Sequence, residues 1–143
     1  MAANIRRVVD TAGAPRVSAV APISQAVAVG NTLYVSGQVG IDPSTGKLVE
    51  GVEQQCHQVL KNIGKILEDQ GIDYNNVVKT TVLMASMNDY KQINEIYAGY
   101  FKAPYPARAA YQVACLPLNC QVEIECIAIL GKIIDDTSSG GKL

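Results

Sequence analysis

The sequence contains little of what several common classes of protein require. It has no tryptophan and a single histidine, His57, among 143 residues. One histidine cannot supply the acid and base imidazole pair that a ribonuclease often uses, nor a metal site built from several histidines. The four cysteines, at positions 56, 115, 120 and 126, form no C-x-x-C pair, so zinc-ribbon and thioredoxin-type motifs are missing. We expect them to be buried free thiols.

Charge and long hydrophobic runs are also scarce. The formal net charge is −1, and Arg6-Arg7 is the only adjacent basic pair. Affinity for nucleic acid rests on lysine and arginine, so nucleic acid is a poor candidate partner. No stretch approaches the roughly 20 apolar residues that span a bilayer, and we expect no membrane partner. We expect a cytoplasmic protein. The mitochondrion and the peroxisome stay open, because Gly141-Lys142-Leu143 differs from a peroxisomal Ser-Lys-Leu signal at one residue.

The apolar residues that are present predict a mixture of strands and helices. Helical spacing of apolar side chains predicts a helix from Val52 to Leu67, with Gly71 at its C-terminal cap. Ser86 or Asn88 can cap a second helix, whose apolar stripe would include Tyr90, Ile93, Tyr97, Tyr100 and Phe101. The predicted strands cover residues 5–10, 26–29, 32–36, 77–85, 108–114 and 121–130.

These elements predict one α+β domain over residues 1–134, followed by a disordered tail, 135–143. Two helices can cover only one face of a mixed sheet. The last strand is apolar on both faces in its second half, with Ile127 and Ile129 on the uncovered side. Uncovered apolar surface is typical of an interface, so we expect a homo-oligomer with a candidate site in a cleft between subunits.

Arg108 and Glu123 have the clearest chemical use among the charged residues. They lie near the beginnings of two consecutive predicted strands, so pairing of these strands would bring them together. An arginine fork binds a carboxylate through two parallel hydrogen bonds, and a nearby glutamate can orient or deprotonate a water. The spacing leaves a second interpretation open, in which the two residues form a salt bridge at an oligomer interface.

Several motifs resemble one known family. The clearest is Pro106-Ala107-Arg108-Ala109-Ala110-Tyr111-Gln112-Val113-Ala114, followed by Leu116-Pro117 and Val122-Glu123-Ile124-Glu125. Tyr34-Val35-Ser36-Gly37-Gln38 and Asn94-Glu95-Ile96-Tyr97 fit as well. Together they resemble the RidA/YjgF imine deaminases, also called perchloric-acid-soluble protein or endoribonuclease L-PSP, and their animal branch in particular.

The resemblance implies a fold and a reaction. The family folds like chorismate mutase and forms homotrimers around a sheet-lined barrel, with sites at the subunit interfaces. Its deaminases hydrolyse 2-imino acids to 2-oxo acids and ammonia without a metal or an organic cofactor. Arg108 would bind the substrate carboxylate, and Glu123 would position the attacking water. The other implied substrate contacts are Ser36, Gly37, Asn94 and Ala110, the last through its backbone.

Ile23 is the main departure from the family pattern. The family usually has a tyrosine over the substrate at this position, and here the matching stretch is Ala21-Pro22-Ile23-Ser24-Gln25. We expect an altered activity rather than a lost one, because isoleucine still offers an apolar wall. Two other functions stay open: an endoribonuclease or translation inhibitor, and a non-catalytic protein that binds metabolites or unfolded chains.

Overall fold

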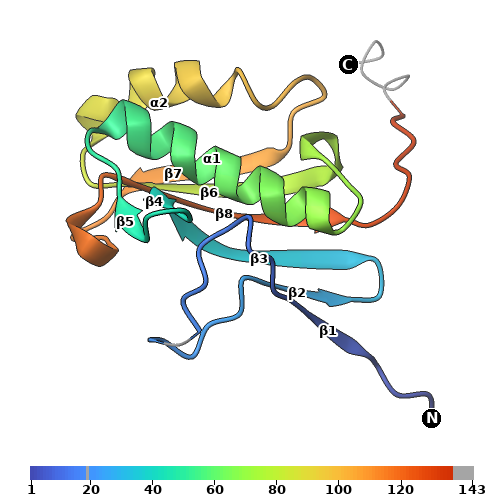
Figure 1. Ribbon diagram of the computed structural model, residues 1–143. Helices are drawn as coiled ribbons and strands as arrows, with labels where there is room; N and C mark the ends of the chain where they lie inside the picture. Colours follow the sequence, from blue (N-terminus) through green and yellow to red (C-terminus); the bar gives the residue numbers. More distant parts are fainter. Residues whose placement is uncertain (19, 137–143) are drawn as a thin grey trace.

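The computed structural model describes residues 1–18 and 20–136, which form one six-stranded mixed sheet with two helices on one face (Figure 1). The strand order is β1-β2-β3-β8-β6-β7, and a separate two-stranded β4-β5 hairpin lies beside it. The elements are β1 (Arg6–Val9), β2 (Ala26–Val29), β3 (Thr32–Val39), β4 (Ile41–Asp42), β5 (Lys47–Leu48), α1 (Val52–Asp69), η1 (Tyr74–Asn76), β6 (Val77–Met84), η2 (Met87–Asp89), α2 (Tyr90–Tyr97), β7 (Ala107–Gln112), η3 (Pro117–Asn119) and β8 (Val122–Ile129). The predicted α+β class, with both helices on one face, is confirmed.

Strand β8 lies in the middle of the sheet and determines its two faces. Its residues alternate between buried and partly exposed: Val122, Ile124, Cys126 and Ala128 are buried. These four side chains pack beneath the helices, because successive side chains of a strand point to opposite faces. The alternate residues, which include Glu123, therefore lie on the face that neither helix covers, as the sequence predicts.

Helix α1 covers the centre of the sheet with a continuous apolar stripe. Its side chains at helical spacing are buried, and Gly71 follows the helix with a φ of 73°, a conformation that glycine adopts without strain. The buried apolar residues of the helix are Cys56, Val59, Leu60, Ile63, Ile66 and Leu67. The predicted helix and its end are confirmed.

The predicted pairing of the last two strands is wrong. Strand β7 pairs with β6 in parallel, and β8 pairs antiparallel with both β3 and β6. Parallel neighbours need a crossover connection, and α2 supplies it between β6 and β7. The strand with apolar residues on both faces, β8, takes a central place, while the more exposed β7 stays at the edge.

The expectation that all four cysteines are buried is wrong for one of them. All four cysteines are free thiols, but Cys115 is exposed while the other three are buried. No helix in the described part of the chain is long and apolar enough to cross a membrane. Of the predicted tail, residues 135–143, positions 137–143 lie outside the described residues, as does the Gly141-Lys142-Leu143 tripeptide.

Candidate functional site

The Glu123 carboxylate lies against the backbone of β3, where that strand is irregular. The pairing of β3 with β8 shifts between Val35 and Gln38, which places Gly37 in the irregularity. A β-carbon built on Gly37 would come within 2.7 Å of Glu123 Oε2. The absence of a side chain at Gly37 is therefore what makes room for the Glu123 carboxylate.

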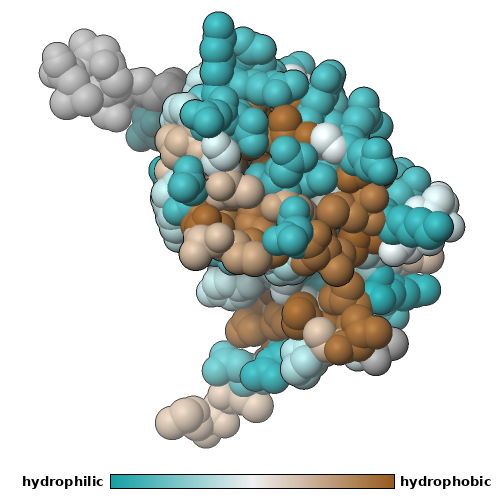
Figure 2. Space-filling model, turned by 90° about the vertical axis from the view of Figure 1, so that its left-hand side faces the viewer, coloured by the Kyte–Doolittle hydropathy of each residue, from teal (hydrophilic) through white to brown (hydrophobic). Residues whose placement is uncertain are grey.

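A pocket of about 310 Å³ opens in front of this carboxylate. Its walls come from the loop before β2, from β3 and from η3, and they bring together the predicted residues Ile23, Ser36, Gly37 and Glu123. The full lining is Val17, Val20, Ala21, Ile23, Ser24, Gln25, Ser36, Gly37, Gln38, Val39, Ile41, Pro117, Leu118 and Glu123. Figure 2 shows the side of the molecule that this loop and η3 border, and hydrophobic side chains gather over its middle and lower part.

Gln25 fastens the loop that forms one wall of the pocket. Its buried amide accepts a hydrogen bond from the Thr11 N–H at 2.7 Å and donates to the carbonyls of Thr11, Ala14 and Pro15 at 3.0, 3.2 and 3.0 Å. Ser36 adds a second tie, because its hydroxyl donates to the Ser24 carbonyl at 2.6 Å. The Ser36 hydroxyl thus holds the loop in place.

The environment of Glu123 favours its protonated form. Partial burial raises the pKa of its carboxyl, and the nearby negative charge of Glu125 raises it further. A glutamate with a raised pKa is a stronger base when it is ionised. The position and the electrostatics of Glu123 both suit a group that accepts a proton from water.

Arg108 lies on edge strand β7, and helix α2 holds its guanidinium. Nη2 donates to Asn94 Oδ1 at 2.8 Å and to the Tyr90 hydroxyl at 3.2 Å. The Arg108 Cζ lies 4.9 Å from the centre of the Tyr97 ring, which is within the range of a cation–π contact. The described part of the chain contains two ion pairs, Arg16–Asp10 and Lys65–Glu68, and neither includes Arg108.

Tyr90 is a candidate site residue that the sequence did not reveal. Its spacing predicted a core position, but α2 begins at Tyr90 and ends at Tyr97, and the Tyr90 side chain is exposed. The pKa of Tyr90 is lowered. The hydrogen bond with Asn94 has the largest effect, followed by the hydrogen bond from Arg108 and by the positive charge of Arg108. Ser86, one of the two predicted caps, accepts a hydrogen bond from the Asn88 N–H in the short η2 turn that leads into α2.

Within one chain, Arg108 and Glu123 lie on opposite faces of the sheet. Arg108 is in register with Thr80, which is buried and whose hydroxyl is 2.8 Å from that of Tyr97 on α2. Glu123 is in register with Leu83 and points to the uncovered face. Strand β6 also lies between β7, which carries Arg108, and β8, which carries Glu123. The two strands are therefore about 10 Å apart in the plane of the sheet. They form neither the predicted neighbouring pair nor a salt bridge in a single chain.

The remaining predicted residues fall into the same two groups. Asn94 holds Arg108, and Ala110 follows two positions after Arg108 on β7, on the same face and partly buried. The structure therefore contains two candidate half-sites. One contains Glu123, Gly37, Ser36 and Ile23, and the other contains Arg108, Asn94, Tyr90 and Ala110.

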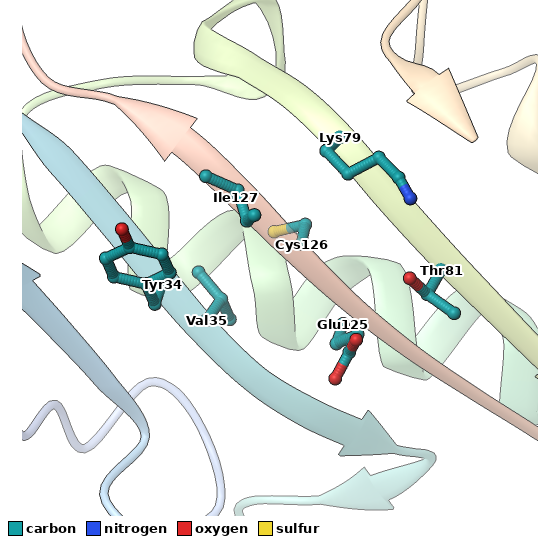
Figure 3. Close-up of a pocket in the computed structure, with 7 residues that line it drawn as sticks. All are labelled: Tyr34, Val35, Lys79, Thr81, Glu125, Cys126 and Ile127. Atoms are coloured by element: carbon teal, nitrogen blue, oxygen red, sulfur yellow. The ribbon is translucent and has the colours of Figure 1, made fainter. Parts of the chain in front are cut away.

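A second pocket, of about 260 Å³, lies on the uncovered face of the sheet (Figure 3). Tyr34, Ile127, Lys79, Thr81 and Glu125 line it from β3, β8 and β6, with α1 behind the sheet in this view. The Tyr34 side chain is 51% exposed. On the uncovered face, the side chains of Tyr34 and Ile127 therefore line a shallow hollow together with the charged groups of Lys79 and Glu125.

Comparison with known proteins identifies the family. Residues 11–130 match the model of the family described as Endoribonuclease L-PSP. The chain is 55% identical over 134 residues to the 2-iminobutanoate/2-iminopropanoate deaminase of Homo sapiens, covering 93% of this chain and 96% of that protein. It is 55% identical over 126 residues to Reactive Intermediate Deaminase A, chloroplastic, of Arabidopsis thaliana, covering 87% and 66% of the two chains.

Solved structures agree with the match in sequence. The RidA structure from an Antarctic Psychrobacter superposes with a TM-score of 0.83 at 46% identity, covering 87% of this chain and 99% of that one. Escherichia coli TdcF, solved with bound serine, superposes with a TM-score of 0.82 at 34% identity, covering 87% and 99%. The chain therefore belongs to the Endoribonuclease L-PSP family, the RidA/YjgF group that its sequence motifs predict.

Proposed function

We propose that this chain hydrolyses 2-imino acids, such as 2-iminobutanoate and 2-iminopropanoate, to 2-oxo acids and ammonia. One observation carries the proposal: a glutamate with a raised pKa faces an apolar pocket, while Arg108, which forms no ion pair with a described residue, is held by Asn94 and Tyr90 at a second half-site. Relatives that share 55% and 56% of their residues with this chain have the deaminase name, which supports the same reaction.

Arg108 binds the substrate carboxylate in this proposal. Asn94 accepts from one guanidinium nitrogen and fixes the direction of the fork, and the Tyr97 ring supports its face. A fixed fork loses less conformational freedom when it binds a carboxylate through two parallel hydrogen bonds. The carboxylate is then held in one orientation, which places the neighbouring imine carbon.

Glu123 orients the attacking water. Its carboxylate takes a proton as the water oxygen bonds to the imine carbon, and a carbinolamine forms. The proton returns from Glu123 to the nitrogen, and the carbon–nitrogen bond breaks with its electron pair on the nitrogen. The hydroxyl proton passes to the departing ammonia as the carbonyl forms, so that the iminium and water become a 2-oxo acid and ammonium. An iminium carbon is already electrophilic, so positioning contributes most, and a well-placed base contributes roughly 10²–10⁴-fold.

The reaction needs two copies of the chain. Arg108 and Glu123 lie on opposite faces of one sheet, so Arg108 of one subunit has to act with Glu123 of another. A homotrimer with a site at each interface satisfies this requirement. The uncovered face with its exposed Tyr34, and the unpaired edge of β7, are surfaces that such an assembly would cover.

Features of this chain favour a deaminase over a nuclease, although the family description includes endoribonuclease. His57, the single histidine, is half-buried, and its Nδ1 lies 2.8 Å from the Tyr100 hydroxyl, which makes it a packing residue. The net charge of −1 offers little attraction for phosphates. We propose a cytoplasmic location. Cell fractionation tests it, and recovery in an organelle, as the chloroplastic name of the A. thaliana relative implies for that protein, would overturn it.

A coupled assay tests the proposed function. An amino-acid oxidase generates the 2-imino acid in solution, and 2-oxo acid formation is followed with the wild-type protein and with Arg108→Ala. The proposal predicts acceleration by the wild type and its loss in the variant. Light scattering on both proteins should give three subunits. A wild-type trimer that does not accelerate hydrolysis would refute the deaminase and favour a binding role.

A further inference from the structure

The pocket in front of Glu123 is apolar over most of its wall. Val17, Val20 and Ile23 line it from the loop before β2, Ile41 from β4 and Leu118 from η3. Its volume of about 310 Å³ lies at the lower end of the range of known ligand pockets, which suits a compact ligand. A pocket of this size and polarity is matched to an aliphatic group of a few carbon atoms.

Leu118 is presented to this pocket at a conformational cost. Its φ is 58°, and the next residue, Asn119, also has a positive φ of 53°. A left-handed conformation is strained for leucine, and its side chain is 65% exposed. Strained residues gather at functional sites, where the strain serves to place a side chain. Leu118 lines the same pocket as Glu123, and its exposed side chain is available for contact with a ligand there.

We propose that this pocket takes the substrate side chain and that the chain prefers 2-imino acids with a branched aliphatic side chain, such as 2-imino-4-methylpentanoate, over 2-iminopropanoate. This inference rests on the proposed function. In this proposal the imine carbon lies at Glu123, and the substrate side chain packs against Ile23 and Leu118, which line the same pocket. A pocket that is apolar on those sides stabilises each added methylene group of the substrate.

The expected preference follows from the burial of apolar groups. One methylene in a hydrophobic pocket changes kcat/KM by about 10-fold or more when it is fully enclosed. The leucine-derived imine has three more carbon atoms than the alanine-derived one, but the pocket is partly open and Leu118 and Val20 are largely exposed. We therefore expect kcat/KM to be about tenfold higher for 2-imino-4-methylpentanoate than for 2-iminopropanoate.

Two substrates test the proposed preference separately from the proposed deaminase activity. D-Amino-acid oxidase generates the two imines from D-leucine and D-alanine, and the enzyme's kcat/KM is measured for each. A leucine-to-alanine ratio of about ten supports the inference. Turnover of both imines with a ratio of one or less overturns the inference and leaves the deaminase standing. No turnover of either overturns the proposed function.

A substitution at Leu118 tests the residue itself. Leu118→Asn keeps a side chain of similar size and tolerates a positive φ, but it replaces the branched apolar end with an amide. We expect the ratio to fall about five- to tenfold. Ile134→Asn, at an exposed apolar residue outside the pocket, should leave the ratio unchanged. Calorimetry with 4-methyl-2-oxopentanoate and pyruvate should show the same change in relative affinity. An unchanged ratio in Leu118→Asn, by both measurements, overturns the role of Leu118.

Discussion

Replacing Gly37 with alanine should displace the Glu123 carboxylate, which we propose as the catalytic base, and leave the fold intact. The new β-carbon would lie 2.7 Å from Glu123 Oε2 and 3.0 Å from its Cδ, which is closer than real β-carbons approach other atoms. The φ of Gly37 lies outside the left-handed region, so the alanine itself is not strained. The end of the Glu123 side chain is the flexible partner, and we expect it to move by about 1 Å to regain an ordinary contact distance.

The expected loss is about 100-fold in kcat, because a base misplaced by about 1 Å costs this much in an oriented reaction. The free energy of unfolding should change by no more than about 1 kcal/mol, since Gly37 is exposed. The 2-oxo acid assay gives kcat, and urea unfolding gives the stability.

The Glu123→Gln background provides the control. If Gly37→Ala acts by moving the carboxylate, it should cost less than about threefold once that carboxylate is gone, because residues that act as a unit are not additive. A loss of about 100-fold in both backgrounds would show that Gly37 acts through some other contact, and the reasoning would be wrong.

Three further predictions follow from the contacts of the two half-sites. Tyr90→Phe removes the 3.2 Å hydrogen bond to Arg108 and should raise KM by about 2–10-fold with little change in kcat, as steady-state kinetics will show. Activity should fall as pH falls through the raised pKa of Glu123, because the base must be ionised. Glu125→Gln removes a nearby negative charge and so lowers the pKa of Glu123. The acid limb of the pH profile of kcat/KM should therefore move to lower pH. A limb that stays in place or moves to higher pH would contradict the assigned base. Gln25→Ala leaves the backbone groups of residues 11–15 without their partner, so urea unfolding should show a loss of about 1–3 kcal/mol.

Local patterns predicted the parts of the fold that depend on neighbours in sequence. The positions of Val122, Ile124 and Cys126 predicted the face of β8 that the helices cover. Successive side chains of a strand point to opposite faces, so a strand buried on one face has an apolar residue at every second position of its sequence. The apolar stripe of α1 and the glycine after it gave that helix and its end. Gly30 lies in the turn that joins β2 to β3 and has a φ of 59°.

Strand pairing could not be predicted in the same way. The segment between β7 and β8 is short enough for a hairpin, and only the crossover through α2 places β7 beside β6 instead. The expected pairing would have brought Arg108 and Glu123 close together within one chain, and the structure places them on opposite faces of the sheet. Tyr90 was misplaced for a related reason: its spacing fits the apolar stripe, but it is the first residue of α2, where its hydroxyl reaches Arg108. Both errors concern contacts between segments distant in sequence.

Mixing two inactive variants tests the central claim, that each site needs Arg108 of one subunit and Glu123 of another. Arg108→Ala and Glu123→Ala are each purified, unfolded, mixed in equal amounts and refolded, and 2-oxo acid formation is measured. Random assembly should restore about one quarter of the wild-type sites, because an interface with both intact residues arises by two even chances. Each variant refolded alone should remain inactive. A mixture no more active than either variant would contradict the claim, because it would mean that both residues act within one chain.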